Sequence, residues 1–325
     1  MKPVLIFLSC ILATSLANAD DVKVAECEVA NEKVKVFILA GQSNMQGQGV
    51  VDMDHPKYYN GGKGILKNVM KNPRRAKQYA HIQDKNGAWV VRDDVWVRFR
   101  VKSGIKAGPL TIGFTGYEGN HHIGPEFQFG HILGAAIKQQ VLLIKTAWGG
   151  KSLYKDFRPP SAGGETGVYY TKMIQEIDEA LGALPKEFPA YKNRGYEIAG
   201  FVWFQGWNDM YDEKARSEYR DNLVHLINDV RQVVKNSNLP VVIGELGNGG
   251  EKAGKNMLLI RQAQADAAKH KGFEKTVKFV KTTSFARPAN ESPNVGHGHH
   301  WFGNAESYFL VGDALGNAMV ELLKR

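Results

Sequence analysis

The stretch Phe37-Ile-Leu-Ala-Gly-Gln-Ser-Asn-Met-Gln46 decides the fold and carries the residue on which the functional hypothesis depends. The run from Val34 to Leu39 is short, apolar and rich in β-branched and aromatic residues, which predicts a buried strand. Ala40-Gly41 ends the run, because small residues allow a sharp turn with backbone close to a ligand. Ser43 then follows the strand, at the position where open α/β sheets bind ligands. Taken alone, such a serine is more typical of a helix N-cap, so the rest of the chain must decide.

Beyond Pro125 the pattern alternates between apolar runs and residues at helical spacing. A doubly wound, mostly parallel sheet with helices on both faces is therefore expected. A chain of 325 residues can bury a large core as one α/β domain with elaborated loops or as two domains, and we expect one domain over residues 20–325. The expected strands cover residues 141–146, 198–204, 239–243 and 277–282, and the expected helices cover residues 127–137, 173–184, 223–234, 257–268 and 304–323.

The segment from about 46 to 120 breaks this rhythm. It contains turn clusters and two short strand-like runs, Trp89–Arg92 and Val95–Val101, which predict a small β-rich insertion that forms a subdomain or lid. The chain has 42 Lys and Arg against 33 Asp and Glu, and residues 63–107 hold seven Lys and five Arg against three Asp. This basic segment therefore accounts for the whole net charge of +9. It indicates either an anionic partner or a solvated charged face.

The N-terminus has the pattern of a secretory signal peptide over residues 1–19. Lys2 precedes an apolar run from Val4 to Leu16, and Ala17-Asn-Ala19 provides a cleavage site. The run is too short for a membrane helix and Asp20-Asp21 follows at once. We expect a protein that is exported to the periplasm or the extracellular space, with no membrane span. Cleavage would leave Cys27 without a partner for an internal disulfide.

Four loops at the expected carboxyl ends of strands carry polar residues that suit ester hydrolysis. Such ends meet at one edge of a parallel sheet. A serine can attack there while a histidine takes and returns its proton, and backbone N–H groups and an amide side chain can stabilise the oxyanion. The loops are Gly41-Gln-Ser-Asn-Met45, Thr146-Ala-Trp-Gly-Gly-Lys-Ser152, Trp203-Phe-Gln-Gly-Trp-Asn-Asp209 and His297-Gly-His-His-Trp-Phe-Gly-Asn304.

These residues and their order resemble the SGNH hydrolase superfamily and, within it, the sialate O-acetylesterase-like carbohydrate esterases. The resemblance covers the chain from about residue 33 to the C-terminus, apart from the insertion. It implies a flavodoxin-like three-layer fold, a serine esterase mechanism, no metal and no cofactor. The matching blocks are Gly41-Gln-Ser-Asn-Met45, Gly124-Pro-Glu126, Ala147-Trp-Gly-Gly150, Gln205-Gly-Trp-Asn-Asp209 and His300-Trp-Phe-Gly-Asn-Ala-Glu306.

The resemblance also assigns roles to single residues. Ser43 is the implied nucleophile and His300 the implied base. The implied oxyanion donors are the N–H of Ser43, Gly149 or Gly150, Asn208 and Gln205.

One position departs from the family pattern. The family commonly has an aspartate three residues before the histidine, and this chain has His297 there. A histidine cannot supply the carboxylate that stabilises an imidazolium. Either another acid replaces it, with Asp209 and Glu291 as candidates, or serine and histidine act as a dyad.

Tryptophans in the later loops favour a carbohydrate substrate. Core packing is the ordinary explanation for Trp148, Trp207 and Trp301. However, rings at the rim of a converging site also stack on sugar faces. With the basic segment nearby, we expect acetylated carbohydrates, including acidic ones, and no nucleic-acid partner.

Some alternatives remain open at this stage. His297, His299 and His300 could form a metal cluster, although adjacent histidines rarely all face one ion and no thiolate or paired carboxylate lies nearby. Asn208 could cap the following helix, and Gly149-Gly150 could be only a tight turn. The preferred function is an exported serine esterase that removes O-acetyl groups from carbohydrates. An SGNH lipase or thioesterase and a non-catalytic glycan-binding relative are the alternatives.

Overall fold

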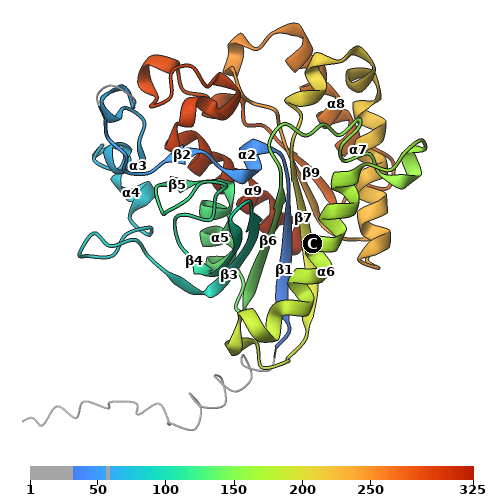
Figure 1. The fold of residues 1–325 in the computed structure, drawn as a ribbon, viewed down its shortest axis with the longest axis horizontal. Coiled ribbons are helices and arrows are strands. Elements are labelled where there is room, and N and C mark those ends of the chain that lie inside the picture. Colours follow the sequence, from blue (N-terminus) through green and yellow to red (C-terminus); the bar gives the residue numbers. More distant parts are fainter. Residues whose placement is uncertain (1–31, 56–58) are drawn as a thin grey trace, which may run out of the picture.

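The computed structural model describes residues 32–55 and 59–325, so the expected signal peptide and Cys27 lie outside the described residues. Within that part, a seven-stranded sheet has the order β4-β3-β6-β1-β7-β8-β9 (Figure 1). All neighbouring strands are parallel except β3 and β4, which confirms the expected fold class. The strands are β1 (Val34–Gly41), β3 (Arg92–Val101), β4 (Gly104–Leu110), β6 (Val141–Ala147), β7 (Tyr196–Phe204), β8 (Val241–Gly244) and β9 (Val277–Val280).

Helices cover both faces of this sheet (Figure 1). Side chains alternate along β1, so that Val36 and Ile38 belong to one apolar core and Phe37 and Leu39 to the other. A strand that is buried on both faces is largely apolar, and in β1 only Lys35, near its start, interrupts the run from Val34 to Leu39. The first core is covered by α6 (Val168–Glu187), α7 (Glu213–Val233) and α8 (Lys255–Ala268), and the second by α5 (Pro125–Ala136) and α9 (Ala305–Leu323). None of the described helices is long and apolar enough to cross a membrane.

The segment 46–120 differs from the expected separate subdomain. Its strand β3 pairs in parallel with β6, and β4 follows at the edge of the sheet. The reason is visible in β3, where five consecutive side chains from Val95 to Phe99 are buried, as in an interior strand rather than a half-exposed one. The remainder adds a two-stranded sheet, β2 (Gly49–Val50) with β5 (His122–Ile123), and the one-turn helices α3 (Leu66–Val69) and α4 (Ala76–Tyr79).

Candidate active site

Ser43 lies directly after β1, at the start of the one-turn helix α2 (Ser43–Gln46). Glycine is required at position 41, because a Cβ there would lie 2.2 Å from the carbonyl oxygen of Phe204 in the neighbouring strand. The carbonyl of Gln42 closes the turn by accepting two backbone N–H groups of α2 at 2.8 and 3.0 Å. Gln42, and not Ser43, holds the N-cap position, and no side chain caps α2. The serine hydroxyl is therefore not a helix cap.

The glycine pair after β6 packs against this turn. A Cβ at Gly149 would lie 3.7 Å from the Cβ of Ser43. Gly150 has a φ of +71°, in the left-handed region that glycine adopts readily. Its carbonyl accepts a 2.6 Å hydrogen bond from Nδ2 of Asn208. The structure thus brings together the loops that carry Ser43, Gly149 and Asn208, as an oxyanion site requires.

Gln205 does not suit the oxyanion role that the resemblance implied for it. It is buried, and its Nε2 lies 2.6 Å from Oδ2 of Asp209, 2.9 Å from the carbonyl of Lys151 and 3.2 Å from Oε1 of Gln42. Its Oε1 accepts from the hydroxyl of Tyr219 at 3.0 Å. The side-chain amide is therefore fully used in joining three loops, and Gln205 is a structural residue.

Neither candidate acid lies against the histidine. Asp209 is buried and accepts backbone N–H groups of Leu153 and Tyr154 at 2.9 and 2.8 Å. Burial raises the pKa of Asp209 to about 6 in spite of these hydrogen bonds. Glu291 is exposed and lines a polar cavity of about 350 Å³ beside α9. Among the described residues neither carboxylate contacts His300. Asp209 instead anchors the loop that contains Leu153 and Tyr154, and Glu291 belongs to the wall of the cavity beside α9.

The loop of residues 297–304, here called the histidine loop, is held through its backbone to the serine turn, which comprises residues 42–46. Nδ2 of Asn44 and Nδ2 of Asn248 each donate to the carbonyl of His299 at 3.1 Å. The hydroxyl of Tyr308 lies 2.9 Å from Oδ1 of Asn44 and 3.3 Å from the carbonyl of His300. Because Asn44 follows Ser43 directly, this network joins the first and last loops of the site.

The imidazole of His300 has no carboxylate partner in the part of the chain that the structure describes. Its Nδ1 is buried and has no hydrogen-bond partner among the described residues. Burial, with a smaller effect from the neighbouring His299 and His297, lowers the pKa of His300 to about 4. The ring is therefore neutral at ordinary pH, as a general base must be. No hydrogen bond joins Ser43 to His300 in the described part of the chain, and such bonds often tighten only when substrate binds.

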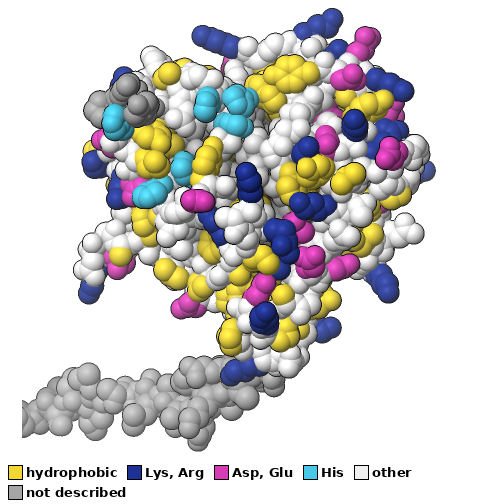
Figure 2. Space-filling model, viewed as in Figure 1, with side chains coloured by type: hydrophobic (Ala, Val, Ile, Leu, Met, Phe, Trp, Pro, Cys, Tyr) yellow, Lys and Arg dark blue, Asp and Glu magenta, His cyan; other side chains and the backbone are white. Residues whose placement is uncertain are grey.

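The three histidines of this loop lie close together on the surface. Ring centroids are 4.0 Å apart for His299 and His300, 5.5 Å for His297 and His299, and 6.2 Å for His297 and His300. Figure 2 shows exposed histidine side chains near the position that α2 has in Figure 1. No group of three or more His, Cys, Asp or Glu side chains within residues 32–55 and 59–325 is arranged to hold a metal ion.

The tryptophans of the motif loops differ in exposure. Trp148 is half-buried, and Nζ of Lys172 lies 5.2 Å from the centre of its ring. Trp207 is also half-buried and lies 5.9 Å from the ring of His299. Trp301 is only 2% exposed. Trp148 and Trp207 remain candidates for stacking on a sugar, whereas Trp301 is mainly a core residue.

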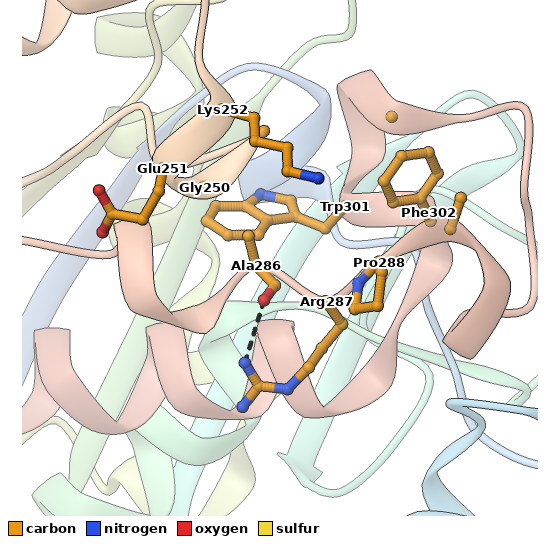
Figure 3. A pocket seen from close by; sticks show the side chains of 11 residues that line it. Gly250, Glu251, Lys252, Ala286, Arg287, Pro288, Trp301 and Phe302 are labelled. Carbon is orange, nitrogen blue, oxygen red and sulfur yellow. Dashed lines mark hydrogen bonds between the residues drawn. The ribbon is translucent and has the colours of Figure 1, made fainter.

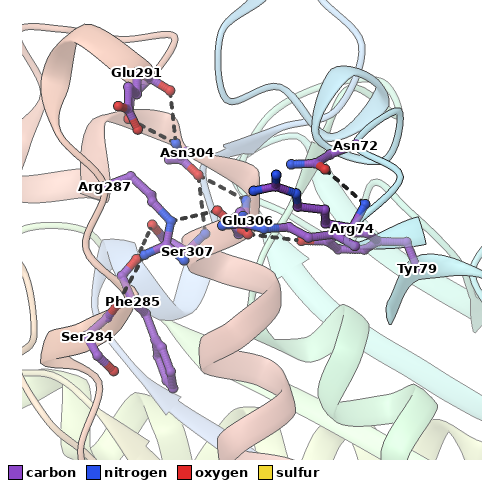
Figure 4. Close-up of polar contacts among 12 residues, drawn as sticks. Asn72, Arg74, Tyr79, Ser284, Phe285, Arg287, Glu291, Asn304, Glu306 and Ser307 are labelled. Carbon is purple, nitrogen blue, oxygen red and sulfur yellow. Dashed lines mark hydrogen bonds and ion pairs between the residues drawn. The ribbon is translucent and has the colours of Figure 1, made fainter. Parts of the chain in front are cut away.

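The basic segment is partly neutralised within the protein. Its strand β3 faces acids of α6, where Arg98 bonds Glu187 at 2.6 Å. Figure 4 shows the cluster beside α9, where the buried Glu306 pairs with Arg287 at 2.6 Å and also with Arg75. Five of its twelve cations form ion pairs with described residues, namely Lys67, Arg75, Arg92, Arg98 and Arg100.

Two supports of the serine turn were not found from the sequence. Lys145 is buried, and its Nζ donates to Oε2 of Glu126 at 2.7 Å and to the carbonyl of Gln46 at 3.1 Å. This ion pair lies beneath the end of α2. Glu126 belongs to the motif Gly124-Pro-Glu126, but the motif does not indicate that Lys145 is its partner. Asn248 follows β8, whose loop carried no recognised motif.

Comparison with known proteins agrees with this geometry. Residues 33–321 match the family model described as carbohydrate esterase, sialic acid-specific acetylesterase. A solved protein from Arabidopsis thaliana is 17% identical, with a TM-score of 0.56, and the match covers 89% of this chain and 99% of that one. XAC1771, a carbohydrate acetylesterase from Xanthomonas citri, is 14% identical with a TM-score of 0.50, over 87% of this chain and 55% of that one. These two show a shared fold.

No relative was found among curated protein sequences. The family match nevertheless spans nearly the whole described chain and includes all four motif loops. The chain therefore belongs to the carbohydrate esterase, sialic acid-specific acetylesterase family, and is a carboxylic ester hydrolase.

Proposed function

We propose that the protein is an exported serine esterase that removes O-acetyl groups from carbohydrates through an acyl-enzyme on Ser43. The observation that carries this proposal is the meeting of three loops at one point. Gly149 packs against Ser43, and Asn44 ties the serine turn to the histidine loop. A nucleophile, a base and oxyanion donors on adjoining loops are the parts that an acyl-transfer site requires.

In this mechanism Oγ of Ser43 attacks the acetyl carbonyl, and Nε2 of His300 takes the hydroxyl proton. The N–H groups of Ser43 and Gly149 and the second amide hydrogen of Asn208 face the developing oxyanion. Collapse of the tetrahedral intermediate releases the sugar hydroxyl, which receives the proton from His300. Water then attacks the acetyl-serine, again with His300 as base, and releases acetate.

Within residues 32–55 and 59–325 no carboxylate contacts His300, which favours a serine–histidine dyad. The imidazolium that forms in each step has no ion-pair partner, so its stabilisation is weaker than in a triad. The same observation keeps one rival, a non-catalytic glycan-binding relative. Assays with p-nitrophenyl acetate and with longer acyl esters separate the esterase from this rival and from a lipase or thioesterase. Hydrolysis of the acetate ester alone supports the esterase, and a preference for long acyl chains supports a lipase or thioesterase. No hydrolysis of any ester supports the binding protein.

Acidic glycans are part of the proposal. Lys63, Arg74 and Lys77 of the basic segment form no ion pair among the described residues. A cationic surface beside a site concentrates anionic polymers, and salt weakens the effect within a screening length of about 8 Å at physiological strength. Hydrolysis of an acetylated acidic polysaccharide should therefore fall with rising salt through a higher KM, while a small neutral ester is little affected. Equal salt responses of the two substrates would contradict this part of the proposal.

Acetate release from a panel of acetylated carbohydrates, with Ser43→Ala as the control, tests the central claim. Export is tested separately, by N-terminal sequencing of protein recovered outside the cytoplasm, which should begin at Asp20. A protein that retains its full N-terminus would contradict the export proposal and leave the esterase proposal in place.

A further inference from the structure

A cavity of about 500 Å³ opens beside the histidine loop, and none of its lining residues belongs to the serine turn (Figure 3). Small-molecule sites have volumes of about 300–1,000 Å³ and mostly apolar walls with a few polar groups. The cavity has this composition. Its walls come from the loop after β8, the segment 286–289 that follows β9, and the histidine loop. They include Lys252, Ala286, Pro288, Gly298, Trp301 and Phe302.

One side chain connects this cavity to the nucleophile. Nδ2 of Asn248 lies 3.4 Å from the carbonyl of Gly298, in the cavity wall, and 3.1 Å from the carbonyl of His299. Its Oδ1 lies 3.4 Å from Nδ2 of Asn44, which follows Ser43. A molecule bound in the cavity would thus lie against the loop that carries the catalytic base.

The histidine-loop wall is built at an energetic cost. Trp301 and Phe302 have φ values of +53° and +54°, in a region that costs a residue with a side chain roughly 1–2 kcal/mol. The indole N–H of Trp301 is buried without a partner among the described residues. Strained residues of this kind concentrate at ligand sites, which favours a functional role for this wall.

The charges around the cavity select an anionic ligand. In Figure 3 the side chain of Lys252 extends towards Trp301 and Phe302, whereas the carboxylate of Glu251 points away. The ammonium group of Lys252 forms no ion pair or hydrogen bond among the described residues, whereas its backbone N–H donates to the carbonyl of Gly249 at 3.1 Å. The other cation, Arg287, is already bound to Glu306 and to the carbonyl of Ala286. Among the described residues that line it, the cavity therefore presents one ammonium group without an ion-pair partner, next to apolar walls.

We propose that this cavity is a subsite for a sugar residue that carries a carboxylate and neighbours the acetylated residue of the substrate. The apolar face of the sugar packs on Pro288 and Phe302, and its carboxylate pairs with Lys252. The substrate is then an acidic oligosaccharide rather than a single sugar. This inference rests on the proposed carbohydrate deacetylation.

The test compares a partly acetylated oligogalacturonate with its methyl-esterified, uncharged counterpart, and uses p-nitrophenyl acetate as a substrate that has no neighbouring sugar residue. A charge-assisted contact at a partly shielded site predicts about ten-fold higher kcat/KM for the acid form. Lys252→Met should abolish this preference by raising KM, Lys252→Arg should retain most of it, and all three proteins should hydrolyse p-nitrophenyl acetate equally. Lys255→Met is the matched control, because Lys255 is exposed at the start of α8 and lines no part of the cavity.

The outcomes are distinguishable. No preference for the acid form, or a preference that survives Lys252→Met, overturns the subsite, as does an equal loss in Lys255→Met. Calorimetric binding of the deacetylated oligogalacturonate to wild-type protein and Lys252→Met tests the subsite without catalysis. Failure to release acetate from any carbohydrate would refute the proposed function, whereas absence of this binding would refute the subsite alone.

Discussion

Replacing His297 with aspartate should convert the proposed dyad into a triad and move the pH dependence of catalysis. In the wild-type protein the pKa of His300 is lowered to about 4 by burial and by its histidine neighbours. A carboxylate at position 297 would have the sequence spacing typical of the family, and the two rings are already 6.2 Å apart. An opposite charge at about 4–6 Å raises the pKa of a histidine by about 1–3 units.

The sign of the shift gives a clear assay. Since the base must be neutral, kcat/KM falls when pH drops below the pKa of His300. For the wild type, kcat/KM on p-nitrophenyl acetate should stay level down to about pH 5 and fall around pH 4. In His297→Asp the fall should begin about 1–3 units higher. At pH 8 the stronger base should raise kcat by about ten-fold, because general-base catalysis follows basicity.

His297→Asn is the matched control, since it removes the imidazole without adding a carboxylate. It should leave the acid limb close to that of the wild type and give no gain at pH 8. The reasoning is refuted if the Asp and Asn variants have the same profile. It is also refuted if the wild-type limb already lies near pH 7, because burial would then not lower the pKa of His300 below the ordinary value of about 6.5.

The remaining predictions concern single side chains. Ser43→Ala should abolish ester hydrolysis with an unchanged circular dichroism spectrum, and a folded, active variant would disprove the nucleophile. His300→Ala should lower kcat by about 10²–10⁴-fold and His299→Ala far less, so equal losses would shift the base to another residue. Asp209→Asn should lower the unfolding free energy by about 1–3 kcal/mol, because it cannot accept both backbone N–H groups and the glutamine amide; an unchanged Tm would contradict the loop-holding role. Arg75→Glu should lower Tm, because it places a second carboxylate beside the buried carboxylate of Glu306 in α9. An unchanged Tm would mean that the ion pair of Arg75 and Glu306 adds nothing to the stability of the fold.

The sequence predicted the sheet because its signal is local. A short apolar run such as 34–39 identifies a buried strand wherever it pairs, and motif loops at strand ends converge in any parallel sheet. The run at Val95–Val101 was correctly recognised as a strand, but its partner β6 lies more than forty residues away. Pairing across such distances leaves no local pattern, so the segment 46–120 was expected to fold apart from the sheet.

The candidate site was predictable only in part, for a related reason. The loops of Ser43, Gly149 and Asn208, which the structure brings together, could be predicted because each of them carries a motif. Gln205 stands in one too, but which acceptors surround its amide depends on three loops at once. The same holds for Asp209. The sequence does not show which groups its carboxylate contacts, and in the structure it accepts the backbone N–H groups of Leu153 and Tyr154.

The network that ties the serine turn to the histidine loop has a consequence for how the protein becomes active. Ser43 lies near the beginning of the described chain, whereas His300 and Tyr308 lie near its end, just before and within α9. A growing polypeptide therefore contains the proposed nucleophile long before the proposed base has been synthesised. A chain that stops before α9, whether by early termination or by proteolysis, lacks Tyr308 and its hydrogen bonds to Asn44 and to the carbonyl of His300. In the proposed mechanism, hydrolysis therefore requires the C-terminal helix as well as the turn that carries Ser43.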